Sequence, residues 1–296
     1  MKKNLAILVL LSTTFFIASC DKVKNPIVKK DTAVGSKFIT KSNKDVSGFK
    51  KVLLEDYTGQ RCKNCPTAAA IITNSLLPVY GNSLVVIAVH QGDVFAKPFG
   101  KYKNDFRTVE GEDWGSSSGF NVDNWPNGLI NRKNYTGAAD QKVPYTAWTS
   151  VVPMALADPM VVKLDVTTEY DTTARALNTY VKASFKASIA NSVKIIVGFI
   201  QDGIVGLQDV NGVEVEDYDF EHVFRGNING TWGTDLKTGP ISANDSANVS
   251  FPNFSLPLNI NAGKGLDVND KNVSVVVFAY DAATKAVLQA EKVKIR

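Results

Sequence analysis

The sequence predicts two domains, an α/β domain over residues 48–157 and an all-β sandwich domain over residues 158–296. Three observations lead to this prediction. In the first half, an apolar run at 51–57, a stretch with helical spacing and a second apolar run at 84–89 follow one another, which is the order of a βαβ unit. In the second half, apolar and polar residues alternate with a period of two, as in half-buried antiparallel strands. At 296 residues, the chain is also long enough for two ordinary domains.

Residues 1–19 have the pattern of a secretory signal peptide, because Lys2 and Lys3 precede an apolar run that is too short to span a membrane. The small residues just before Cys20 resemble a bacterial lipobox, which implies cleavage before Cys20 and its acylation by fatty acids such as palmitate. An ordinary signal peptide followed by an incidental cysteine is the alternative. Residues 20–47 are polar and are expected to form a flexible tether. On this interpretation, acyl chains on Cys20 attach the protein to a membrane.

The charge of the chain argues against nucleic acid as a partner. Removal of Lys2 and Lys3 with the signal peptide lowers the formal net charge from +4 to +2. A protein this close to neutral offers no general attraction for a polyanion. We therefore expect no nucleic-acid partner.

The individual elements are predicted from periodicity and from turn residues. The run at 84–89 is apolar on both faces, which is typical of a central strand covered by helices. Pro78 and Gly81 are expected to end the helix that precedes it. In the first half, we expect strands at 37–40, 51–57, 84–89 and 128–132, helices from residue 66 and over 143–156, and a partly helical insertion at 91–120. In the second half, we expect strands at 162–167, 181–187, 193–200, 248–256, 273–280 and 287–295.

Cys62 and Cys65 form a Cys-x-x-Cys pair at the point where a predicted strand gives way to a predicted helix. The free N–H groups of a first helical turn carry partial positive charge and favour a thiolate. Arg61 and Lys63 flank the first cysteine and should lower its pKa further. Cys62 is therefore the candidate nucleophile, and His90, at the end of the next strand, should lie at the same edge of the sheet.

The pair at a helix start, the buried strand after it and the later Trp125-Pro126 together resemble a thioredoxin-like domain over residues 48–156. The resemblance implies that Cys62 attacks a partner disulfide, that Cys65 resolves the mixed disulfide, and that Pro126, in its cis form, helps to dock the substrate. From the residues alone, Pro126 should be trans, because only about 5% of X-Pro bonds in folded proteins are cis.

Asp56 lies six residues before Cys62, and the resemblance assigns to this position a buried acid that assists deprotonation of the resolving cysteine. Glu55 stands next to it in the same strand. Because neighbouring strand residues point to opposite faces of a sheet, only one of the two acids can lie beneath the cysteine pair. The family position favours Asp56, and the residues alone leave the choice open.

Four short segments carry a second resemblance, to the Omp-28-related outer-membrane lipoproteins of Bacteroidota. They are EDYTG at 55–59, CKNCP at 62–66, EHVFR at 221–225 and NGTWG at 229–233. The resemblance implies a location in the cell envelope at the outer membrane, and a thioredoxin-like domain followed by a β-rich domain.

Two functions follow from these observations. The first is a lipid-anchored thiol-disulfide oxidoreductase that acts on envelope proteins through transient mixed disulfides and needs no cofactor beyond its own dithiol. The second is a non-catalytic surface lipoprotein, an adhesion or assembly module in which the Cys62–Cys65 disulfide is structural. No metal is expected, because zinc at the cysteine pair would need two further ligands, and His90 and His222 fall in different predicted domains.

Overall fold

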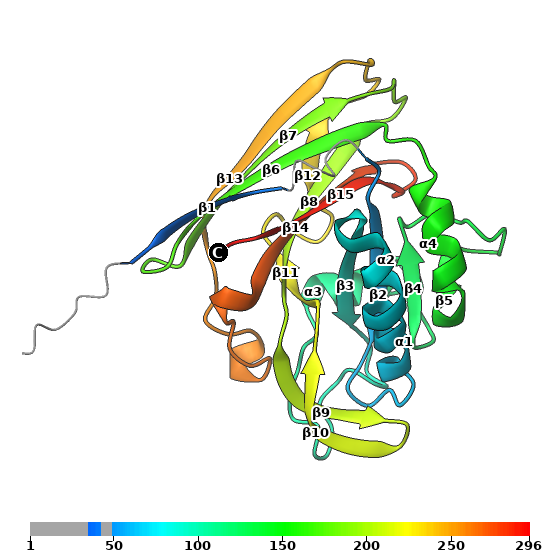
Figure 1. Cartoon of the computed structure of the whole chain (residues 1–296), viewed down its shortest axis with the longest axis vertical. Coiled ribbons are helices and arrows are strands. Elements are labelled where there is room, and N and C mark those ends of the chain that lie inside the picture. The colour runs from blue at the N-terminus through cyan, green and yellow to red at the C-terminus, as the bar shows by residue number, and fades with distance from the viewer. Residues whose placement is uncertain (1–34, 43–48) are drawn as a thin grey trace, which may run out of the picture. The chain divides into compact units, whose positions relative to one another are not determined.

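The computed structural model describes residues 35–42 and 49–296, and residues 35–296 form one compact unit (Figure 1). The predicted signal peptide, Cys20 and most of the predicted tether lie outside the described residues. Within the described part, no helix combines the length and the apolar character that a membrane crossing requires.

The larger of the two main sheets has nine strands in the order β15-β14-β8-β11-β3-β2-β4-β5, with β12 alongside β8. Its strands are β2 (Val52–Thr58), β3 (Leu84–His90), β4 (Asn127–Ile130), β5 (Lys142–Pro144), β8 (Val193–Gln201), β11 (Val223–Asn227), β12 (Thr234–Lys237), β14 (Val273–Asp281) and β15 (Val287–Lys294). Strands β2, β3 and β11 are parallel neighbours, and the other pairs are antiparallel. Every residue of β3 is buried, as its apolar sequence predicts.

The smaller sheet has four antiparallel strands in the order β1-β6-β7-β13. They are β1 (Lys37–Lys41), β6 (Val162–Asp171), β7 (Ala176–Phe185) and β13 (Ser246–Ser255). Burial alternates residue by residue along β6, which confirms the period of two read from the sequence. The buried face of this sheet shares one apolar core with β8 and β14 of the larger sheet.

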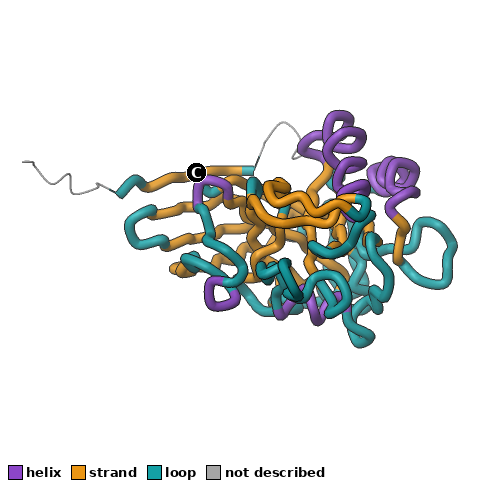
Figure 2. Tube along the Cα trace, turned by 90° about the horizontal axis from the view of Figure 1, so that it is seen from below, coloured by secondary structure: helices purple, strands orange, loops and turns teal. Residues whose placement is uncertain are grey.

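Helices cover both faces of the region around β2 and β3. They are α1 (Cys65–Ile71), the π-helical turn Ile72–Leu76, α2 (Leu77–Tyr80), α3 (Val109–Gly115) and α4 (Trp148–Leu156). Helices α1 and α4 pack with one face of β2 and β3 in one apolar cluster, and Trp114 of α3 packs in another cluster with the opposite face. Figure 2 shows helical segments on both sides of the strands. The π-helical turn precedes Pro78, which has no N–H to bond to the carbonyl of Asn74. Gly81 then ends the helical segment at φ 48°.

The predicted fold class, a thioredoxin-like α/β domain followed by an all-β sandwich, is wrong. The strands β2, β3 and β4 do not form a sheet of their own but share one sheet with β8, β11, β14 and β15 from the second half of the chain. The junction is made by β11, where Val223 lies opposite Ala88 of β3 and the N–H of Ala88 donates to the carbonyl of His222 at 2.8 Å. Strands far apart in sequence therefore complete the sheet that the α/β pattern begins. The result is one mostly β-sheet structure in place of two separate folds.

Strands β9 (Ile204–Val210) and β10 (Val213–Phe220) form a separate two-stranded hairpin that the sequence did not predict. The hairpin contacts α1, and the N–H of Asp209 donates to the carbonyl of Gln60 at 2.8 Å. This contact places a segment of the second half directly beside the Cys-x-x-Cys turn.

Candidate functional site

The cysteine pair lies between the end of β2 and the start of α1, as predicted. Cys62 and Cys65 form a disulfide, with their Cα atoms 5.4 Å apart. Cys65 is the first residue of the helix, and Pro66 follows it at a position where a missing N–H costs no helical hydrogen bond. Cys62 belongs to the preceding turn, and its carbonyl accepts a hydrogen bond from the N–H of Cys65 at 3.1 Å.

Both cysteines are buried, with an exposed fraction of 2% each. The turn that holds Cys62 is fixed from two sides. On one side, the N–H of Arg61 donates to the carbonyl of Phe95 at 3.0 Å. On the other, the side-chain amide of Gln208 in β9 donates to the carbonyl of Cys62 at 3.2 Å. In this arrangement, Cys62 can neither attack a second protein nor be attacked by one.

The two cations expected beside Cys62 have different surroundings. The guanidinium of Arg61 donates to the carbonyl of Asp93 at 2.8 Å and lies over the ring of Phe99, 5.3 Å from its centroid. Lys63 is exposed. Arg61 therefore holds the 93–99 segment against the cysteine turn, and the predicted effect of the two cations on the pKa of Cys62 remains a prediction.

A cavity of about 290 Å³ adjoins the disulfide on the Cys65 side. The residues that form it come from β2, β3, the α1 helix with its π-helical turn, and the β9–β10 hairpin with the residues that follow it. They are Asp56, Thr58, Cys65, Pro66, Ala69, Ala70, Ile72, Thr73, Asn74, Val86, Ala88, His90, Gln208, Tyr218, Asp219, Phe220, Glu221 and His222. Cys62 is not among the described residues that line it, so Cys65 is the cysteine that the cavity reaches.

Asp56 is the acid beneath the disulfide. It lines the cavity together with Cys65, only 2% of its surface is exposed, and its Oδ1 has no hydrogen-bond partner among the described residues. Burial raises the pKa of Asp56 to about 7. A buried carboxyl group without a partner destabilises a fold, and such groups are concentrated at functional sites.

Glu55 points to the opposite face of β2. Its carboxylate accepts two hydrogen bonds from Arg132, from Nε at 2.8 Å and from Nη2 at 2.6 Å, and both side chains are fully buried. The guanidinium of Arg132 also lies within 5 Å of the ring centroids of Trp114, Phe120 and Phe278. The alternation along β2 therefore gives Glu55 a structural partner and leaves Asp56 for the cavity.

His90 lies at the carboxyl end of β3, opposite Thr58 of β2, and lines the same cavity. Its ring makes edge contacts with Phe106 and Phe220, with centroid distances of 5.0 and 5.7 Å. Neither ring nitrogen has a hydrogen-bond partner in the described part of the chain. Burial, followed by the positive charge of Arg225, lowers the pKa of His90 to about 3, so its ring is neutral in ordinary buffers.

The peptide bond between Trp125 and Pro126 is cis, as the thioredoxin-like resemblance implies. Pro126 is buried directly before β4, whose first residue, Asn127, lies opposite Tyr57. Trp125 contacts Phe95 at a centroid distance of 5.7 Å. Pro126 is not among the described residues that line the cavity, and its role in substrate docking remains a prediction.

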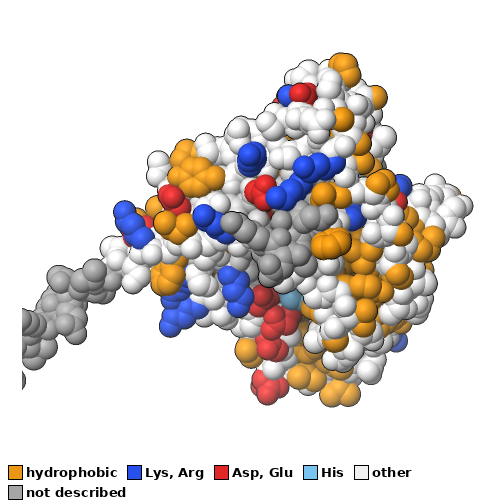
Figure 3. Space-filling view, turned by 45° about the horizontal axis from the view of Figure 1, so that its top comes forward, with side chains coloured by type: hydrophobic (Ala, Val, Ile, Leu, Met, Phe, Trp, Pro, Cys, Tyr) orange, Lys and Arg blue, Asp and Glu red, His pale blue; other side chains and the backbone are white. Residues whose placement is uncertain are grey.

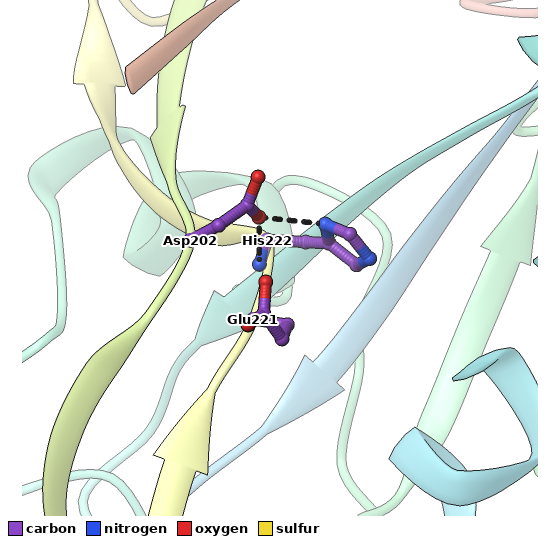
Figure 4. A group of neighbouring side chains, drawn as sticks. All are labelled: Asp202, Glu221 and His222. Carbon is purple, nitrogen blue, oxygen red and sulfur yellow. Dashed lines mark hydrogen bonds and ion pairs between the residues drawn. The ribbon is translucent and has the colours of Figure 1, made fainter. Parts of the chain in front are cut away.

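Asp202, Glu221 and His222 come together (Figure 4), and Glu221 and His222 also line the cavity. Asp202 Oδ1 accepts a hydrogen bond from the backbone N–H of His222 at 2.8 Å. The same oxygen lies 2.9 Å from Nδ1 of the His222 ring. Burial opposes ionisation of Asp202, but the bonds with His222 prevail and lower its pKa to about 2. Partial desolvation, and then the charge of Asp202, raise the pKa of Glu221 to about 7.

The sequence did not predict this group as a site. Glu221 was noted only as part of a family segment, His222 was considered besides only as a zinc ligand for the cysteine pair, and Asp202 was not singled out. The pairing of β8 with β11 sets Gln201 opposite Val223, which brings the next residue, Asp202, beside His222. The adjacent Glu-His pair was the available signal, but its third member could be found only from the strand register.

Comparisons with known proteins identify the family but not the chemistry. The model of the family "Outer membrane protein Omp28" matches residues 115–296, which is more than half of the chain. HBP35 of Porphyromonas gingivalis is similar in structure, with a TM-score of 0.60 and 15% identity over 82% of this chain and 74% of that chain, and this likeness concerns the fold alone.

A domain of the outer membrane lipoprotein Omp28 from Porphyromonas gingivalis is 21% identical over 47% of this chain and 91% of that domain, with a TM-score of 0.30, which is too low to support a structural argument. No curated protein matches the chain. The family match leaves out Asp56, Cys62 and Cys65, so it does not decide what the cavity does. It does confirm the predicted location at the outer membrane. The chain belongs to the Omp28 family of outer membrane proteins.

Proposed function

We propose that the protein is a lipid-anchored outer-membrane protein whose Cys62–Cys65 pair exchanges disulfides with small thiols that enter the cavity. The observation that supports this most strongly is the position of Asp56. A disulfide that only fastens a turn needs no carboxyl group beside it, yet Asp56 is buried without a partner for Oδ1 in the cavity that Cys65 lines. A carboxyl group with a pKa of about 7 can hold or release a proton near neutral pH.

The proposed reaction starts at the sulfur that faces the cavity. An external thiolate attacks Sγ of Cys65, the Cys62–Cys65 bond breaks, and Cys62 leaves as a thiolate while Cys65 becomes a mixed disulfide. A second external thiolate attacks the sulfur of the external group, which gives the oxidised small disulfide and frees Cys65 as a thiolate. Asp56 supplies a proton to Cys65 at this stage and takes it back when a small disulfide reoxidises the pair by the reverse steps and leaves as two thiols.

This assignment exchanges the roles that the thioredoxin-like resemblance implies for the two cysteines. The reason is access, because Cys65 lines the cavity and the turn around Cys62 is held by Arg61 and Gln208. Envelope proteins, the partners expected from the sequence, could form mixed disulfides with Cys62 only if the 93–99 segment or the β9–β10 hairpin moved away.

The test is to trap the mixed disulfide with single-cysteine variants. Purified Cys62→Ser protein should form a stable adduct with oxidised glutathione at Cys65, seen by mass spectrometry and removed by dithiothreitol. Cys65→Ser protein, which keeps only the enclosed sulfur, should react at least about tenfold more slowly. Equal rates for the two variants, or a faster rate at Cys62, would contradict the proposal.

The second candidate function is a non-catalytic surface lipoprotein with a structural disulfide. The 2% exposure of both cysteines and the hydrogen bonds that fix their turn favour it. In the chain-entropy description, a four-residue loop gains only about 2 kcal/mol from its cross-link. This candidate predicts that Cys62→Ala lowers stability by about that amount, and that the native disulfide resists small reductants.

The lipid anchor belongs to the same proposal. Acylation of Cys20 should make the protein incorporate a labelled palmitate analogue and sediment with outer membranes. A Cys20→Ser variant should lose the label and appear in the soluble envelope fraction. If the wild-type protein took up no label, the proposed acylation of Cys20 would be wrong, and the proposal for the cavity would be unaffected.

A further inference from the structure

The side chains of Asp202, Glu221 and His222, here called the rim cluster, lie together as potential metal ligands (Figure 4), and Glu221 and His222 also line the cavity. One ligand atom from each lies within 4.8 Å of the others. Two carboxylates and one imidazole form a mixed oxygen and nitrogen donor set, which suits Zn²⁺ or Mn²⁺ better than Ca²⁺ or Mg²⁺. We propose that the rim cluster binds one divalent transition-metal ion.

The backbone holds two of the three ligands in place. His222 has a left-handed conformation with φ 58°, its N–H donates to Asp202 Oδ1, and its carbonyl accepts from Ala88 of β3. His222 Nδ1 and Asp202 Oδ1 are 2.9 Å apart. Two atoms at this separation can both bind one metal ion through bonds of about 2.1 Å that meet at the metal at an angle of about 90°. The metal ion would therefore replace the proton between these two atoms.

Glu221 supplies the third ligand from an exposed position. Glu221 is the residue next to His222, and its side chain is exposed. Its carboxylate can therefore turn towards the metal without a change in the main chain. Three protein ligands leave open positions for water or for a further ligand, as in catalytic rather than structural metal sites.

A second observation concerns buried polar atoms without partners in the same cavity. Asp56 and His90 line it, each is 2% exposed, and Oδ1 of Asp56 and both ring nitrogens of His90 lack hydrogen-bond partners among the described residues. Buried polar atoms normally have partners. Water or another ligand on a metal at the rim would provide them.

The charge around the cavity favours a cation. Its described lining contains three acids, Asp56, Asp219 and Glu221, and no lysine or arginine. Strand β10 also carries Glu216 and Asp217, whereas its Glu214 is paired with Lys101 at 2.7 Å. A band of acidic side chains that meets a histidine is visible on the face shown in Figure 3. Such a surface attracts divalent cations.

The experiment titrates the metal-free protein, with its disulfide intact, with ZnCl₂ and separately with MnCl₂ in a calorimeter. Because the two cysteines are joined in the disulfide, they offer no thiolate that could serve as an alternative metal site. We expect one ion per chain. Glu221→Gln and His222→Asn should each weaken binding at least about tenfold, whereas Asp217→Asn, which removes one charge from β10 outside the rim cluster, should leave the affinity within about twofold.

His222→Asn is chosen because asparagine tolerates the left-handed backbone at this position. If that variant fails to fold, Glu221→Gln decides the matter, because Glu221 is exposed and its replacement leaves the hydrogen bonds of His222 intact. Visible absorption of the Co²⁺-loaded protein should change in Glu221→Gln and not in Asp217→Asn. Failure to reach saturation at one ion per chain, or equal weakening by Asp217→Asn and Glu221→Gln, would overturn the proposal.

Discussion

Asp56 and Cys65 line one cavity, Asp56 from the strand β2 and Cys65 from the first residue of the helix α1. The neighbouring acid, Glu55, lies on the other face of the strand with Arg132. The strand therefore separates two carboxyl groups with different environments, one ion-paired and one unpaired. The predictions below rest on that separation.

Asp56→Asn should change the pH dependence of stability. The pKa of Asp56 is raised from 3.8 to about 7, so the folded state binds the extra proton between these values and loses stability as the pH rises through about 7. About three pKa units correspond to at most about 4 kcal/mol. Urea unfolding at pH 4.5 and pH 8 should show a smaller difference in Asp56→Asn than in the wild type.

The matched control for Asp56→Asn is Asp219→Asn, which replaces an exposed acid that lines the same cavity. Its unfolding free energy should follow the wild-type pH dependence. Parallel curves for the wild type and Asp56→Asn would mean that the carboxyl group of Asp56 does not titrate in this range.

His90→Phe should stabilise the protein in acid. The pKa of His90 is lowered from 6.5 to about 3. Below pH 6.5 the unfolded state therefore binds a proton that the folded state does not bind, and stability falls as the pH drops towards 3. At pH 5 this loss is about 2 kcal/mol. A phenylalanine packed against Phe106 and Phe220 removes it, so the variant should gain stability at pH 5 relative to pH 7.5. A gain of equal size at both pH values would point to packing alone.

Glu55→Gln should destabilise the fold by about 3 to 5 kcal/mol, because it leaves the buried guanidinium of Arg132 without its counter-charge. Replacing both residues, as Glu55→Leu with Arg132→Met, should recover much of the loss. Denaturant unfolding of the single and double variants measures the difference. A single variant as stable as the wild type would show that the aromatic rings around Arg132 compensate for the missing carboxylate.

Local patterns were sufficient to predict the elements that carry the cysteine pair. The strands 52–58 and 84–90 and the helix from Cys65 were expected within one or two residues, because each has a strong apolar period and clear end signals. The helix α4 was expected to begin at 143 but begins at Trp148, after a short strand and a turn. Asp56 was singled out from the family position, and the observed face of β2 removes the ambiguity with Glu55.

The sheet that joins the two halves of the chain could not be predicted in the same way. Strand β11 pairs with β3 and β8, and such long-range partners leave no trace in a local period. The hairpin β9–β10 was missed because most of β10 is exposed and charged, so burial imposes no alternation on its sequence. That hairpin and the 93–99 segment together fix the turn of Cys62, which is why the sequence suggested an exposed nucleophile.

The central claim is that small thiols reach the disulfide through the cavity, and the rate of its reduction in the native protein tests this most directly. Thr73 lines the cavity and is exposed, whereas Ser75, in the same π-helical turn, is exposed and is not among the described lining residues. Reduction by dithiothreitol should be at least about tenfold slower in Thr73→Trp and unchanged in Ser75→Trp. Equal rates in the wild type and both variants, or reduction only under unfolding conditions, would contradict the account.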